Sequence, residues 1–277
     1  DYNTGVGEGV MGESSGNAIT GNYNVAMGAL AMYNAEGVVN ANTAIGYRAG
    51  YGATTASGSV LIGHQAGDNI TTASGSVFIG VDAGGNVNTG NMNIGIGYNA
   101  FHNAATGDHN IAIGVNAGDA LTSGNKNIAM GYDALGDMTA GTNNIALGYE
   151  SMNALQGSDG GFGNYNIAIG TDAMGSVEGY HTGTEIDGNI AIGANALLGG
   201  DLLNNNIDLM DNIAIGRNAL DGTGNAVAQV GTIAIGFNAG TAINHSDAQG
   251  SVLIGYEAGK AITSGIANIA IGYNALV

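Results

Sequence analysis

The stretch Asn110-Ile111-Ala112-Ile113-Gly114-Val115-Asn116-Ala117 is followed by Asn127-Ile128-Ala129-Met130-Gly131-Tyr132-Asp133-Ala134, seventeen residues further along the chain. The same pattern, Asn, β-branched, Ala, Ile, Gly, two variable residues and Ala, recurs fifteen times at steps of 17 to 23 residues. Self-similarity at such a period is typical of repeat architectures. The central glycines are Gly7, Gly28, Gly46, Gly63, Gly80, Gly97, Gly114, Gly131, Gly148, Gly170, Gly193, Gly216, Gly236, Gly255 and Gly272.

Each copy of the motif favours a strand over a helix. Its apolar positions alternate with period two, and a glycine interrupts every copy. Seventeen residues suit one coil of a flattened solenoid, with two short strands and two turns. The pattern therefore predicts an all-β parallel β-solenoid of about 15 coils of 17–23 residues.

The two faces of the expected strand differ in size. The residues three and one before the glycine, called the outer positions below, are mostly β-branched, and we expect them to share a face that forms the core. The residue between them, the inner position, is usually Ala, so its face would pack closely against a second copy of the chain. The alanines expected at this self-interface are Ala26, Ala44, Ala112, Ala129, Ala146, Ala168, Ala191, Ala214, Ala234 and Ala270.

Three copies carry a bulky residue at the inner position: Leu61, Phe78 and Leu253. All three share Ala-Gly after the motif, which indicates volume compensation in a packed site. The leading Asn predicts a ladder of amides from coil to coil. The glycine, present in every copy, predicts a positive φ or a close approach of two backbones.

The motif resembles the YadA-like head repeat of trimeric autotransporter adhesins and similar runs in phage tail fibres. The resemblance rests on Asn24-Val25-Ala26-Met27-Gly28, Asn110-Ile111-Ala112-Ile113-Gly114, Asn268-Ile269-Ala270-Ile271-Gly272 and Gly272-Tyr273-Asn274-Ala275-Leu276. It implies a homotrimer of left-handed β-rolls. The chain departs from the adhesin heads in its coil length, because their coils are shorter than 17 residues.

One repetitive segment, 1–277, accounts for the whole chain, and we interpret it as a fragment of a longer fibre. Longer connections gather in the region 149–231, where extra residues would form loops. They are Met152–Gly163, Met174–Gly188, Leu197–Asp211 and Leu220–Gly231.

Composition excludes several classes of function. The chain has 22 acidic and 4 basic residues, a net charge of −18, so it lacks the basic surface that nucleic-acid binding needs. No apolar run reaches the roughly 20 residues of a membrane-spanning helix. No catalytic motif is present, and we expect no enzymatic activity. Stacked carboxylates could hold calcium, but the Asp-x-Asn-x-Asn-Gly loop is absent, so we expect no cofactor, with calcium as the open alternative.

Aromatic residues are the candidates for receptor contact. Six tyrosines directly follow the motif glycine, and their rings would suit stacking on sugars of a host or surface glycan. The other interpretation is that they only cover the turns. The long connections add two candidates. The full set is Tyr47, Tyr98, Tyr132, Tyr149, Tyr180, His181, Tyr256 and Tyr273.

Together these features predict a structural and adhesive trimeric fibre segment, extracellular, without membrane insertion. A phage tail fibre that binds a receptor is the first hypothesis and the head of a bacterial surface adhesin the second. An ice-binding solenoid is a remote alternative, since the hydroxyl column Thr55, Thr72, Thr89, Thr106 and Ser123 keeps its spacing over five coils only.

Overall fold

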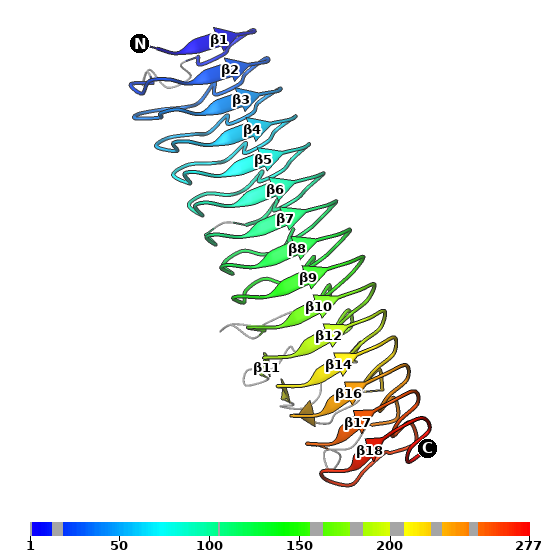
Figure 1. Cartoon of the computed structure of the whole chain (residues 1–277). Coiled ribbons are helices and arrows are strands. Elements are labelled where there is room, and N and C mark those ends of the chain that lie inside the picture. The colour runs from blue at the N-terminus through cyan, green and yellow to red at the C-terminus, as the bar shows by residue number, and fades with distance from the viewer. Residues whose placement is uncertain are drawn as a thin grey trace. The chain divides into compact units, whose positions relative to one another are not determined.

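The computed structural model describes residues 2–12, 19–104, 106–155, 163–177, 185–199, 208–222, 229–243 and 249–277. These residues form strands and turns, with no helix among them, and consecutive coils pair in parallel (Figure 1). The predicted all-β parallel β-solenoid is therefore confirmed. The chain divides into two compact units, Asp1–Met130 and Gly131–Val277.

Every copy of the motif forms one strand of three residues. The first unit contains β1 (Thr4–Val6), β2 (Val25–Met27), β3 (Thr43–Ile45), β4 (Val60–Ile62), β5 (Val77–Ile79), β6 (Ile94–Ile96), β7 (Ile111–Ile113) and β8 (Ile128–Met130). The second contains β9 (Ile145–Leu147), β10 (Ile167–Ile169), β12 (Ile190–Ile192), β14 (Ile213–Ile215), β16 (Ile233–Ile235), β17 (Val252–Ile254) and β18 (Ile269–Ile271). Within each unit, motif residues pair with the same motif position in the next coil, as Ile111 does with Ile94.

The other side of the coil differs from the expected second strand. Among the described residues, a second sheet is found only in the second unit, where β11 (Ile186–Asp187), β13 (Leu209–Met210) and β15 (Gln229–Val230) pair in parallel. In other described coils the corresponding segment before the motif strand has isolated bridges, such as that of Asn40 with Ser57, and bends, while turns follow the strand. They still bond from coil to coil, since the N–H of Met32 donates to Ala49 O at 3.0 Å. The turns form because residues such as Met32 (φ 51°) take left-handed backbone angles that a strand excludes.

The assignment of the two strand faces was wrong. The inner position points into the coil: Ala112 is fully buried, whereas its neighbours Ile111 and Ile113 on the outer face are only half-buried. The ten alanines proposed for the self-interface are at most 2% exposed within one chain. They therefore have no surface to offer a second copy. The outer positions, proposed as core, are the ones that remain accessible.

The narrow space inside the coil, the lumen, explains this arrangement. Residues after the glycine also point inward: Ala117, third after Gly114, is fully buried, and so is Leu135, fourth after Gly131. Together with the leading Asn110, also buried, they fill the lumen, so the strand can contribute only a small residue.

The predicted volume compensation is confirmed. Where the inner residue is bulky, the fourth position after the glycine is Gly, and a Cβ there has no room. A Cβ on Gly84 would lie 2.5 Å from the Phe78 ring, and one on Gly67 would lie 2.7 Å from Leu61 Cδ2. Each bulky inner residue thus has a glycine in the fourth place of its own coil and of the coil before, which leaves room for its side chain in the lumen.

The predicted asparagine ladder is also present. Asn110 is fully buried, and its backbone N–H donates to Asn93 Oδ1 at 2.8 Å. Its side-chain Nδ2 donates to Gly124 O at 2.8 Å, and its Oδ1 accepts the N–H of Asn127 at 2.9 Å. Each amide therefore satisfies buried backbone groups of the neighbouring coils.

The motif glycine meets both predicted conditions. Gly97 and Gly114 have φ of 140° and 139°, a region that residues with a side chain avoid. A Cβ on Gly97 would also collide with the carbonyl oxygen of Gly114 in the next coil. Backbone conformation and close approach thus both require glycine here.

Candidate functional site

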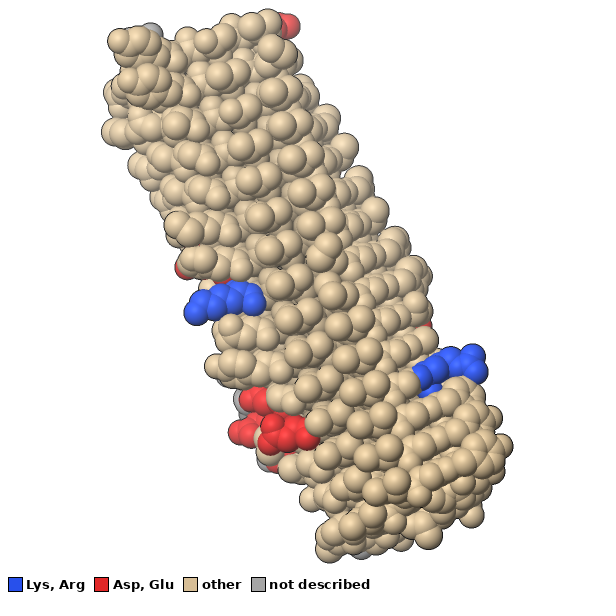
Figure 2. All heavy atoms as spheres, viewed as in Figure 1, with Lys and Arg blue, Asp and Glu red and all other residues tan. Residues whose placement is uncertain are grey.

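The outer face of the main sheet is an accessible apolar surface in each unit. It consists of the two outer positions of every strand, which carry Val, Ile, Leu or Met apart from two threonines, Thr4 and Thr43. Val25 and Met27 are 39% and 47% exposed, and Ile169 and Ile192 are both 36% exposed. No charged residue interrupts these positions, and Figure 2 shows charged groups only sparsely on the face in view. We call these residues the apolar sheet face.

Aromatic side chains border this face on one side. The residues directly after the motif glycine form the tyrosine column, in which Tyr98 is 52% exposed. The rings stack from coil to coil, with centroids 5.2 Å apart for Tyr47 and His64. Tyr132 stacks on Tyr149 at the same distance. The expected exposure of this column is therefore found.

Stacking limits what the tyrosines can bind. Tyr256 lies between Phe237 and Tyr273, with both ring centroids 5.1 Å away, so its two faces are covered by neighbouring rings. Sugars stack on ring faces, whereas these rings leave their edges and hydroxyl groups for outside contacts. Tyr98 differs because Val81 and Val115 take the adjacent places in its column.

Two of the predicted contact residues, Tyr180 and His181, lie outside the described residues. The long connections are described only in part. In their described parts, carboxylates accept hydrogen bonds from backbone N–H groups. Asp187 Oδ1 accepts the N–H of Asn164 at 2.7 Å, and Asp208 Oδ1 accepts the N–H of Glu185 at 3.1 Å.

The acidic residues in the second place after the motif glycine have a conformational cause. Asp133, Glu150, Asp172 and Glu257 have φ between 49° and 54°. The asparagines of this column are left-handed as well, as Asn116 shows with φ 53°. Asn and Asp adopt this region more readily than other residues with a side chain. The enrichment of Asp and Asn in one column is the sequence signal for these left-handed turns.

Two of these carboxyls have pKa values that are shifted in opposite directions. The pKa of Asp172 is raised, chiefly because partial burial disfavours its charged form and also because Glu150 lies beside it. The pKa of Glu257 is lowered, chiefly by the hydrogen bond that Lys260 Nζ donates to its Oε1 at 2.8 Å. In the part of the chain that the structure describes, no three acidic or histidine side chains are grouped so that they could hold a metal ion.

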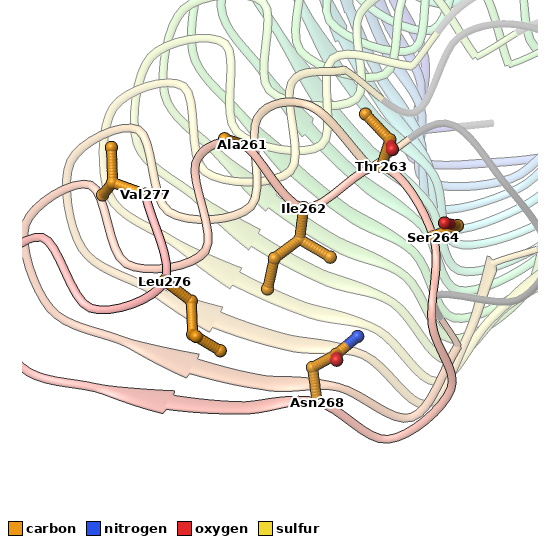
Figure 3. Close-up of a pocket in the computed structure, with 7 residues that line it drawn as sticks. All are labelled: Ala261, Ile262, Thr263, Ser264, Asn268, Leu276 and Val277. Carbon is orange, nitrogen blue, oxygen red and sulfur yellow. The ribbon is translucent and has the colours of Figure 1, made fainter.

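A hollow of about 400 Å³ opens at the coil that carries β18 (Figure 3). Ile262, Leu276 and Asn268 point into it, and Leu276 is 56% exposed. The equivalent Leu220, fourth after Gly216, is fully buried. The hollow is therefore the mouth of the lumen, lined by Ala261, Ile262, Thr263, Ser264, Asn268, Leu276 and Val277.

No protein-family model, curated protein or solved structure matches this chain. Within the described ranges there is also no helix of the length and apolarity that crossing a membrane requires.

Proposed function

We propose that the chain is a structural and adhesive segment of an extracellular fibre and works as a homotrimer, in a phage tail fibre that binds a host receptor. The apolar sheet face is the observation that carries this proposal. A continuous apolar surface that is free of charge marks a contact with another macromolecule. Three copies that turn this face toward a common axis would remove it from water.

In this trimer the interface consists of the outer positions and not of the alanines at the inner position. Ile111 and Ile113 project from the same strand, and every pair of outer residues repeats one coil further along. Branched side chains in straight rows can interdigitate with equal rows of two other copies. The tyrosine column, which runs beside the face, would form the partly exposed rim of such an interface.

Ladders from coil to coil fit a stiff fibre. Backbone hydrogen bonds, the buried asparagines and the packed lumen all connect each coil to its neighbours. The net charge of −18 opposes unspecific aggregation of an exposed fibre. The resemblance to YadA-like heads makes the head of a bacterial surface adhesin the second biological setting for the same trimer.

The native mass tests the trimer directly. Multi-angle light scattering should give three times the 27.3 kDa of one chain. Ile111→Lys with Ile113→Lys places two charges on the apolar sheet face, and this variant should be monomeric. The matched control, Thr55→Lys with Thr72→Lys, adds the same charge on exposed turn residues and should remain trimeric. A folded wild-type monomer, or a trimer of the face variant, would overturn the proposal.

Tyr98 is the residue at which receptor contact is tested, because its neighbours in the tyrosine column are valines and not aromatic rings. Tyr98→Ala should reduce binding to host cells at an unchanged melting temperature, because Tyr98 is half-exposed. Tyr256→Ala is the comparison, since its covered ring faces predict a loss of stability with little loss of binding. Unchanged binding by the Tyr98 variant would remove this column from the adhesive surface.

A further inference from the structure

Tyr132 and Tyr149 form a pair of stacked phenols on two neighbouring coils. Their ring centroids are 5.2 Å apart, and their ring planes differ by only 9°. The backbone holds the pair in place, because the N–H of Glu150 donates to Tyr132 O at 2.9 Å. Both tyrosines are accessible, with exposed fractions of 43% and 50%. Two phenols are therefore kept close together where a solute can reach them.

A carboxylate lies beside one of the two hydroxyl groups. The Tyr149 hydroxyl donates a hydrogen bond to the Glu150 side chain, and this bond, together with the negative charge of Glu150, raises the pKa of the hydroxyl. Loss of an electron reverses the situation, because an oxidised phenol is strongly acidic and passes its proton to a hydrogen-bonded base. Negative charge nearby also stabilises the electron-deficient ring. Tyr149 is thus placed for oxidation by one electron.

Other tyrosines lack either the base or the second phenol. Tyr33 and Tyr51 stack with centroids 5.8 Å apart and planes 23° apart, and the Arg48 guanidinium lies 4.2 Å from the centre of the Tyr51 ring. This positive charge opposes the removal of an electron. Tyr98 is about as exposed as Tyr149, but its neighbours in the tyrosine column are valines. A radical at Tyr98 has no phenol beside it in the column to couple with.

The pair Tyr256 and Tyr273 has the same stacking but a different charge beside it. The ring centroids are 5.1 Å apart. The carboxylate that follows Tyr256 in the chain, Glu257, accepts a hydrogen bond from Lys260 Nζ at 2.8 Å. A carboxylate that is paired with a cation is a weaker proton acceptor, so this pair should couple more slowly than Tyr132 and Tyr149.

We propose that Tyr132 and Tyr149 are a site of oxidative cross-linking, at which hydrogen peroxide and a peroxidase join two neighbouring coils covalently. Each phenol loses one electron and its hydroxyl proton, which Glu150 accepts from Tyr149. The two radicals then couple through the ring carbons next to the C–OH carbons and form one C–C bond. The hydrogens of these two carbons move to the oxygens and restore both phenols. In total two C–H bonds break, two electrons and two protons leave, and one peroxide molecule is reduced to two water molecules.

Mass spectrometry of the oxidised chain tests the site. After treatment with peroxidase and hydrogen peroxide, the wild type should lose the mass of two hydrogen atoms and yield a peptide that joins Tyr132 to Tyr149. Denaturing electrophoresis should place this link in the band of a single chain. Tyr149→Phe keeps the ring and removes the hydroxyl, so it should abolish the link. Tyr98→Phe is the matched control, because it removes the same group from an exposed tyrosine of the column, and it should leave the link unchanged.

The role of Glu150 has its own measurement. Glu150→Gln should slow formation of the link roughly tenfold at pH 7, with oxidation of free tyrosine in the same solution as the reference. The wild-type rate, on the same reference, should fall as the pH is lowered and Glu150 is protonated, whereas the rate of the Glu150→Gln chain should stay constant. Equal rates and equal pH profiles would overturn the role of Glu150 as proton acceptor.

The link closes a loop over residues 132–149 and restricts the unfolded chain. The oxidised wild type should therefore unfold at a higher urea concentration than the oxidised Tyr149→Phe chain. No linked peptide from the wild type, or a link of Tyr132 and Tyr149 only between different chains, would overturn the inference. Both residues belong to one chain, so this result would leave the proposed lateral trimer intact.

Discussion

At the scale of single residues, unusual backbone angles determine the composition of the chain. The chain has 52 glycines, and many of the described glycines, Asn and Asp residues have positive φ, which most residues with a side chain avoid. Some bulky residues also adopt these unfavourable backbone angles, such as Leu135 with φ 53°. The burial of their side chains in the lumen compensates for the conformational cost. Burial of a leucine recovers about 1.5–3 kcal/mol, which exceeds that cost.

Two glycines separate the effect of backbone conformation from that of close packing. Gly97→Ala should lower the free energy of unfolding by about 3 kcal/mol or more, since a forbidden φ and a clash with Gly114 O add together. Gly58→Ala should cost only about 1–2 kcal/mol, because nothing lies near its Cβ and the equivalent Ala41 in the preceding coil is also left-handed. Urea unfolding measures both, and equal costs would show that φ alone requires the motif glycine.

The pKa shifts of Asp172 and Glu257 predict opposite responses to pH. A raised pKa means that ionised Asp172 destabilises the fold, and this cost appears as pH rises through its folded-state pKa. Asp172→Asn should therefore raise the melting temperature at pH 7 and have no effect at pH 3. The lowered pKa of Glu257 means that its carboxylate stabilises the fold until pH falls through that pKa. Glu257→Gln should lower the melting temperature at pH 7 only, and shifts of the same sign would contradict the assignment.

At the scale of the coil, one strand of three residues cannot be understood alone. The same period-two alternation fits a strand with bulky residues inward and one with bulky residues outward. The choice depends on what else fills the lumen. Ala134 and Leu135 follow Gly131, both are fully buried, and they leave room only for an alanine from the strand. The coil therefore turns its isoleucines outward.

A double-mutant cycle tests the compensation inside the lumen. Phe78→Ala leaves a cavity and should cost about 3–5 kcal/mol. Gly84→Leu should also destabilise strongly, because its Cβ would lie 2.5 Å from the Phe78 ring. The double variant reproduces the Ala and Leu pair of the coil that contains Ala129 and Leu135. It should be more stable than the sum of the single changes predicts by about 1–3 kcal/mol, whereas additivity would mean that the two positions are independent.

At the scale of the whole molecule, charge and apolar surface act against each other. The net charge of −18 repels a second copy, whereas the contact proposed for the apolar sheet face would attract it. Raising the salt concentration from about 0.05 to about 0.5 M screens the repulsion and leaves the apolar contact, so the oligomeric fraction should increase. Sedimentation velocity at fixed protein concentration measures this fraction. Dissociation by salt would show that ion pairs, not the isoleucine rows, hold the copies together.

The sequence by itself determined the repeat, the parallel solenoid, the amide ladder, the need for glycine and the compensation around Leu61, Phe78 and Leu253. Each depends on spacing and residue size within one copy or between adjacent copies, and both are visible in the order of residues. Only the tertiary structure decided which strand face points inward, because residues of the turns compete for the same lumen. It also decided that most described coils have bridges, bends and turns in place of a second strand, and that the isoleucine rows, not the alanines, are the surface a partner can reach.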